Sequence, residues 1–72
     1  MNALGVNSVM DLSVDFQMNG SQMKRNVKAA KTDKFGENWV LVETKDQNGQ
    51  SNTQWIGMKF FQMWLGQIGY AA

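Results

Sequence analysis

Residues 10–31 of the chain, MDLSVDFQMNGSQMKRNVKAAK, determine the fold that the rest of the sequence has to complete. Apolar residues alternate strictly with polar ones over residues 10–18, which is the period of a β-strand with one buried face. The Asn19-Gly20 pair that follows is a strong hairpin signal, because both central residues of a type I′ turn require a positive φ. The stretch therefore predicts a long β-hairpin closed by this pair, with strands over residues 9–18 and 21–31.

The Asn-Gly turn also predicts which residues of the two strands face each other. The predicted pairs are Met18–Ser21, Phe16–Met23, Leu12–Val27 and Met10–Ala29 on the apolar side, and Asp15–Lys24 and Asp11–Lys28 on the polar side. Opposite charges directly across a ladder stabilise a pairing, so the hydrophobic pattern and the charge pattern favour the same register.

The rest of the chain predicts a second hairpin and a helix. Residues 39–44 are rich in β-branched and aromatic residues, residues 46–49 form a turn, and residues 50–57 return as a fourth strand. Apolar residues then recur at helical spacing over residues 58–70. We therefore expect an α+β fold in the order β-β-β-β-α. Its four-stranded antiparallel sheet would carry one C-terminal amphipathic helix on one face, in a single domain over residues 9–70 after a flexible N-terminal arm over residues 1–8.

The register of the second hairpin depends on its loop. If Asn48 and Gly49 form a two-residue turn, Val42 opposes Trp55, whereas a four-residue loop over residues 46–49 would shift this pairing. In the two-residue register the second hairpin has apolar residues on both faces, with Val40, Val42 and Trp55 on one and Leu41 and Ile56 on the other.

The composition excludes most catalytic chemistry. The 72 residues include no cysteine and no histidine, so the thiol nucleophile, thiolate metal sites and the usual general base are missing. The serines have no base to activate them, and no glycine-rich phosphate loop precedes a helix. We therefore expect a protein that is not an enzyme, with no catalytic residues, no metal site and no cofactor.

The sequence also favours a cytoplasmic protein without a membrane segment. Residues 1–10 contain neither the basic nor the apolar part of a secretory signal. The longest apolar cluster, residues 55–65, is too short to span a bilayer.

Positive charge is concentrated in one segment, although the net charge of the whole chain is only +1. Residues 24–34 contain five basic residues and one acidic residue, a net charge of +4, and the remaining two basic and five acidic residues sum to −3. A basic strand with an aromatic residue nearby is typical of a surface that follows a sugar-phosphate backbone and stacks a base. The candidate nucleic-acid-binding residues are Lys24, Arg25, Lys28, Lys31, Lys34 and Phe35, with Trp39 as a further stacking surface. The alternative is that Lys24 and Lys28 only pair with Asp15 and Asp11 and keep an exposed sheet face soluble.

Arg25 departs from the pattern of its strand. The predicted register places it on the apolar side, opposite Val14. A charge there is costly unless it lies at a rim, pairs with an acid such as Glu43, or extends out of the sheet. Alternatively, Arg25 contacts a ligand or a second subunit.

The three tryptophans and four phenylalanines are many for a chain of this size. They form the core, or the small domain leaves part of them as an apolar patch for a partner. The candidate interface residues are Trp39, Val40, Val42, Trp55 and Trp64. Apolar groups on both faces of the second hairpin favour self-association, so we expect a homodimer or a larger homo-oligomer.

Two functions fit these features. The first is binding of nucleic acid, either single-stranded or recognised by shape. The expected order of elements resembles that of single-stranded-DNA-binding proteins of the transcriptional-coactivator and Whirly type, which pair their sheets and helices into a dimer; the resemblance covers this layout and no residue motif. The second is a small regulator or inhibitor of a host protein, of the type encoded by phages and mobile elements, docking through an aromatic patch or a sheet edge. A structural subunit of a larger assembly is a third possibility.

Overall fold

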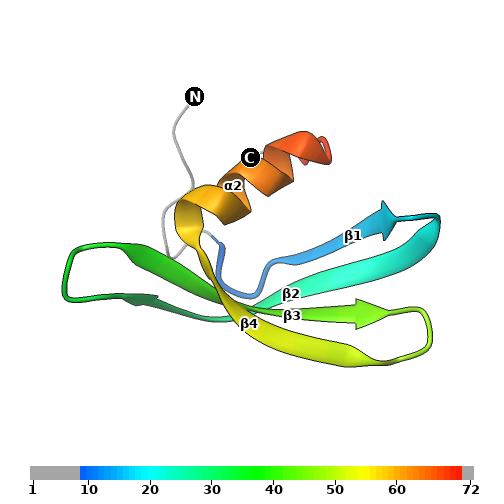
Figure 1. The fold of residues 1–72 in the computed structure, drawn as a ribbon, viewed down its shortest axis with the longest axis horizontal. Coiled ribbons are helices and arrows are strands. Elements are labelled where there is room, and N and C mark those ends of the chain that lie inside the picture. The colour runs from blue at the N-terminus through cyan, green and yellow to red at the C-terminus, as the bar shows by residue number, and fades with distance from the viewer. Residues whose placement is uncertain (1–8, 71–72) are drawn as a thin grey trace.

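The computed structural model describes residues 9–70, which form a four-stranded antiparallel sheet and one helix. The elements are β1 (Ser13–Met18), β2 (Ser21–Thr32), β3 (Asn38–Asp46), β4 (Ser51–Gly57) and α2 (Met58–Gln67). The strands lie in the sheet in their sequence order, and α2 lies across one face (Figure 1). The predicted α+β class and the order β-β-β-β-α are confirmed. The expected N-terminal arm lies outside the described residues.

The register predicted for the first hairpin is confirmed along β1. Phe16 pairs with Met23 and Asp15 with Lys24. The turn has the predicted positive φ at both central positions, 54° at Asn19 and 80° at Gly20. Local side-chain alternation and turn chemistry were therefore sufficient to fix this part of the sheet.

The first strand starts later than predicted, because the chain turns before Ser13. Asp11 has a φ of 62°, and the amide of Leu12 donates to the carbonyl of Val9 at 3.1 Å. Three pairs were predicted in this segment. Of these, Leu12 and Val27 are joined by one hydrogen bond, in which the amide of Val27 donates to the carbonyl of Leu12 at 2.9 Å. The predicted pairs Met10–Ala29 and Asp11–Lys28 lie outside the ladder and are wrong.

The loop between β3 and β4 spans residues 47–49 and is held by the side chain of Asp46. The Asp46 amide donates to the carbonyl of Gln50 at 2.9 Å, and the Asp46 Oδ1 accepts the amides of Asn48 and Gln50 at 2.9 and 3.0 Å. Gly49 takes a φ of 84°, which favours glycine. The loop is thus one residue longer than the predicted Asn48-Gly49 turn.

This longer loop shifts the register of β4 by one residue. Leu41 pairs with Trp55, and Val42 pairs with Gln54. Because successive strand residues point to opposite faces, the shift moves Trp55 to the face of Leu41. The prediction that Trp55 shares a face with Val40 and Val42 is therefore wrong.

The same loop geometry joins β2 to β3. The Asp33 amide donates to the carbonyl of Glu37 at 2.9 Å, and the Asp33 Oδ1 accepts the amides of Phe35 and Glu37 at 2.9 and 3.0 Å. Gly36, like Gly49, has a positive φ, here 82°. The chain thus forms a continuous meander in which two of the three turns are closed by an aspartate followed three residues later by a glycine.

The core lies between the sheet and α2. Its buried residues are Val9, Val14, Val27, Val40, Val42, Met58, Phe61 and Leu65. Val40 and Val42, expected at an interface, are fully buried beneath α2, because β3 runs through the middle of the sheet where the helix covers it.

A β-bulge at Lys28 adapts the long strand β2 to this core. Val27 pairs with Val42 and Ala30 with Val40, so both contribute to the helix-covered face although three positions separate them. Lys28 is the extra residue, and the bulge leaves it exposed. The bulge therefore keeps β2 apolar toward the helix without burying a lysine.

Helix α2 begins directly after β4 and ends in a Schellman motif. The Tyr70 amide donates to the carbonyl of Leu65 at 2.9 Å, and the Gly69 amide donates to that of Gly66 at 3.2 Å. Gly69 has a φ of 81°, so the helix stops at Gln67, before the predicted end at residue 70. Among residues 9–70, no helix has the length and apolar content needed to cross a membrane.

Two adjacent phenylalanines test the placement of α2. Phe61 is 1% exposed, and Phe60 is 71% exposed. Phe61→Ala should lower the free energy of unfolding by about 3–5 kcal/mol, because it leaves a cavity in the core. Phe60→Ala should change it by less than about 0.5 kcal/mol. Urea denaturation followed by circular dichroism measures both; equal effects would contradict this orientation of α2.

Candidate functional site

The sheet face opposite α2, here called the open face, carries both aromatic and basic side chains. Its residues on β2, β3 and β4 include Lys24, Lys28, Ala29, Lys31, Trp39, Leu41, Glu43, Lys45 and Trp55. Within residues 9–70, no helix or further strand lies on this face (Figure 1). An uncovered face that carries two tryptophans is unusual for a small soluble domain and marks a candidate binding surface.

One end of the open face carries Lys31, Trp39 and Trp55 and is here called the aromatic end. Lys31 and Trp55 lie at its centre. Trp55 is 40% exposed, and the Lys31 Nζ lies 4.2 Å from its ring centroid. Lys31 pairs with Trp39 in the ladder, so its side chain extends across β3 to reach the indole on β4. The result is a cation held over an exposed ring, a favourable cation–π geometry.

Trp39 is held in place by the loop that precedes it. Its Nε1–H donates to the Asp33 Oδ2 at 3.0 Å, and its ring is half-buried. This hydrogen bond is the main cause that lowers the pKa of the Asp33 carboxyl, with smaller contributions from the backbone amides of Glu37 and Phe35 and from the charge of Lys31. The carboxylate therefore closes the turn with one oxygen and fixes an indole of the open face with the other.

Phe35 and Lys34 form the tip of the β2–β3 hairpin. Phe35 is 80% exposed, and the Lys34 Nζ lies 5.2 Å from its ring centroid. Phe35 is absent from the core, so its apolar area contributes little to the folded state. Its position next to the aromatic end of the open face extends that surface beyond the sheet.

The lysines at the other end of the open face are paired with acids. Lys24 lies 3.8 Å from Asp15, while Lys28 and Lys45 lie 3.5 and 4.0 Å from the same Oε1 of Glu43. Asp15–Lys24 is the predicted pair, whereas Lys28 pairs with Glu43 and not with Asp11. In the described part of the chain, Lys31 and Lys34 form no ion pair with an acid. The two lysines without an ion pair therefore lie at the aromatic end, where Lys31 still interacts electrostatically with Asp33.

Arg25 lies on the helix-covered face, opposite Val14 as predicted. Its Nε donates to the Thr44 Oγ1 at 3.1 Å, and its guanidinium carbon lies 4.4 and 5.4 Å from the ring centroids of Trp64 and Phe16. The suggested pairing with Glu43 is wrong, because Glu43 points to the open face. Burial lowers the pKa of the guanidinium, which nevertheless stays charged near neutral pH. Arg25 is thus separated by the sheet from the lysines of its own strand.

Trp64 also lies apart from the other two tryptophans. Its ring packs edge-on against Phe16 at 4.9 Å and stacks on Phe61 at 5.7 Å between centroids. It therefore belongs to the packing between α2 and the sheet and is not on the open face.

The structure places five of the residues singled out in the sequence at this end of the sheet, in two groups. Lys31 contacts Trp55 and pairs with Trp39, whereas Lys34 and Phe35 contact each other at the tip of the β2–β3 hairpin. The sequence interpretation missed that Trp55 joins this group with Leu41. The signal that could have shown it is the repeated Asp-x-x-Gly spacing at residues 33–36 and 46–49, which specifies the longer loop and hence the face of Trp55.

The described residues offer no cluster of His, Cys, Asp and Glu that could hold a metal ion. Comparison of the chain with protein-family models, with curated proteins and with solved structures gives no match. The function of the site is therefore inferred from its own geometry.

The link between Asp33 and Trp39 predicts a pH dependence of stability. The pKa of Asp33 is lower in the folded than in the unfolded chain, so its stabilisation is complete above the ordinary pKa of about 3.8 and is lost as the pH falls through the folded value. Asp33→Asn should flatten the fall of the thermal midpoint below about pH 4. Thermal melts between pH 2 and 6 measure this.

Trp39→Phe is the matched variant, because it removes only the indole donor. It should flatten the same pH dependence in part. Indistinguishable pH profiles for the wild type and both variants would contradict the role of this hydrogen bond.

Proposed function

We propose that the chain binds single-stranded nucleic acid on the aromatic end of the open face. The observation that carries the proposal is the Lys31 ammonium held 4.2 Å from the ring centroid of the exposed Trp55. A cation beside an exposed aromatic ring is the combination that binds a phosphate and stacks the adjoining base. The chain would act as a binding protein and not as an enzyme.

Trp39 and Trp55 are suited to stack neighbouring bases. Trp39 pairs with Gly57, two residues from Trp55, so the two indoles are diagonal neighbours on the same face. Phe35 adds a third ring at the hairpin tip, 80% exposed. Base–aromatic stacking requires a free base face, which a single strand offers and a duplex does not.

Lys31 and Lys34 would supply the contacts to phosphates. Both lie beside aromatic rings, and neither forms an ion pair with an acid among residues 9–70, although Lys31 interacts electrostatically with Asp33. Lys24, Lys28 and Lys45 would contribute less, because each already has a carboxylate within 4.0 Å. We therefore expect binding that depends steeply on salt and only weakly on base sequence.

Two substitutions on the open face test the proposal. Trp55→Ala should weaken binding of a fluorescent oligothymidylate at low salt by about 1–3 kcal/mol, the usual contribution of one stacked base. Lys31→Ala should weaken binding and lower the slope of log K against log salt by about 0.7, the value for one phosphate contact on a single strand. Fluorescence anisotropy across a salt series measures both quantities.

Matched controls lie on α2, across the sheet from the open face. Phe60→Ala removes an exposed aromatic ring, and Lys59→Ala removes an exposed positive charge. Neither should change the affinity by more than about two-fold, which is within the usual range for a surface substitution away from a binding site. Absence of binding at low salt, or equal losses in the controls, would contradict the proposal.

A protein partner is the second candidate, and exposed residues of α2 favour it. Phe60 and Met63 are 71% and 61% exposed on the helix surface that faces away from the sheet. Binding of a host protein or of a second copy of the chain there would be lost in a Phe60→Ala, Met63→Ala double variant. It would persist in Trp55→Ala and would depend little on salt, which separates it from nucleic-acid binding.

A further inference from the structure

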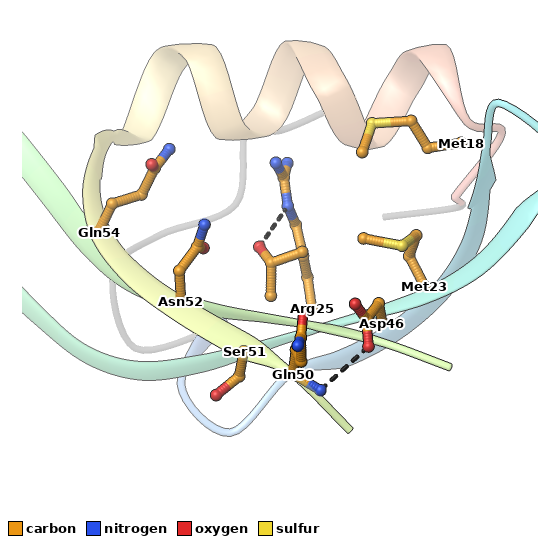
Figure 2. Close-up of a pocket in the computed structure, with 9 residues that line it drawn as sticks. Met18, Met23, Arg25, Asp46, Gln50, Ser51, Asn52 and Gln54 are labelled. Carbon is orange, nitrogen blue, oxygen red and sulfur yellow. Dashed lines mark hydrogen bonds between the residues drawn. The ribbon is translucent and has the colours of Figure 1, made fainter. Parts of the chain in front are cut away.

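A pocket of about 310 Å³ lies on the helix-covered face, beyond the core (Figure 2). Its lining includes Met18, Met23, Arg25, Thr44, Asn52 and Gln54. Arg25 rises from the floor toward α2, between the two methionines on one side and the two amides on the other (Figure 2). This volume is large enough for a small organic molecule.

The guanidinium of Arg25 is held in one orientation, and its terminal nitrogens remain available as hydrogen-bond donors. Its Nε is used by the Thr44 Oγ1 at 3.1 Å, and the Trp64 ring lies 4.4 Å from its central carbon. Over residues 9–70, no carboxylate forms an ion pair with it. A partly buried guanidinium without a counter-ion is costly, and an incoming anion would offset that cost.

The amide side chains on β4 extend this donor group. Asn52 pairs with Thr44 and Gln54 with Val42, so both side chains lie on the helix-covered face next to Arg25. Both are exposed, and the hydrogen bonds found within the described residues do not involve their side chains. Met18 and Met23 provide an apolar wall on the opposite side (Figure 2).

We propose that this pocket binds a small carboxylic acid with a short apolar tail. The carboxylate would accept hydrogen bonds from the terminal nitrogens of Arg25 and from the amides of Asn52 and Gln54. The tail would lie against Met18 and Met23, whose flexible thioethers adapt to ligand shape. The site is on the other side of the sheet from the aromatic end of the open face and does not depend on the function proposed there.

A carboxylate fits this pocket better than a phosphate. The planar fork of a guanidinium can bind two oxygens of either anion, but a carboxylate carries a single charge, whereas phosphate is partly a dianion near neutral pH. Asp46 also lines the pocket, and its Oδ1 is occupied by the amides of its own loop. Its negative charge would repel a dianion more strongly than a monoanion.

Titration with sodium hexanoate, followed by proton–nitrogen correlation spectra of the whole chain, tests the site. We expect saturable shifts of the Arg25 Nε–H and the Trp64 indole signal, and none at Trp55. Hexanol lacks the charged oxygens, and inorganic phosphate lacks the apolar tail and carries more negative charge near Asp46, so each should bind at least about ten-fold more weakly. No saturation with hexanoate, or equal binding of hexanol or phosphate, would overturn the proposal.

Variants connect the shifts to the named side chains. Arg25→Gln should weaken hexanoate binding about ten-fold or more, whereas Lys24→Gln, the same change of charge on the neighbouring residue of the open face, should leave it unchanged. The double variant Asn52→Ala, Gln54→Ala changes only exposed positions and decides the question even if Arg25→Gln does not fold. Unchanged affinity in that double variant would overturn the proposed donor group.

Discussion

The carboxylate of Asp46 determines on which face of the sheet Trp55 lies. By accepting the amides of Asn48 and Gln50, it stabilises a loop over residues 47–49 in place of a two-residue turn. The extra residue inverts every side chain of β4 relative to β3, because strand residues alternate between faces. Without it, Trp55 would lie on the helix-covered face, and the open face would lose its exposed indole. A turn some distance from the candidate site thus decides the composition of that site.

The limited size of α2 explains why aromatic residues remain on the open face. A helix over Met58–Gln67 can cover one face of a four-stranded sheet, and its buried residues pack on Val40 and Val42. The opposite face has no such cover among the described residues, yet it carries Trp39, Leu41 and Trp55. Trp55 is outside the core and keeps an exposed indole, which makes this face a candidate binding surface.

Arg25 shows how the covered face accepts a charge without an acid. Aromatic rings of Trp64 and Phe16 and the hydroxyl of Thr44 surround the guanidinium. Cation–π contacts and one hydrogen bond offset part of the desolvation cost, and the pocket beside it leaves the rest to solvent or a ligand. The basic strand is therefore divided by the sheet, with lysines on one side and Arg25 on the other.

The sequence predicted the architecture well and the candidate site in part. Strict alternation and the Asn19-Gly20 turn were sufficient for the first hairpin, because both signals are local. The face of Trp55 was not predictable from alternation alone, since it depends on the length of the β3–β4 loop. The Asn48-Gly49 pair predicts a two-residue turn there, which is one residue too short. The partner of Lys28 was also missed, because Glu43 comes next to it only through the pairing of β2 with β3 and the bulge between them.

Lys31, Lys34 and Phe35 were among the candidate nucleic-acid-binding residues predicted from the sequence. The contact between Lys31 and Trp55 was not predicted, because it arises from a side chain that crosses β3. Long-range contacts of this kind follow from sheet order and register, and an error of one residue in the register removes them.

The three tryptophans provide the most direct test of single-strand binding, since each indole N–H gives its own signal. Trp39 and Trp55 lie on the open face, whereas Trp64 belongs to α2 and packs between the helix and the sheet. Titration with an unlabelled oligothymidylate at low salt should shift the indole signals of Trp39 and Trp55 and leave that of Trp64 in place. Shifts confined to Trp64, or no shift of any indole signal, would contradict nucleic-acid binding at the aromatic end of the open face.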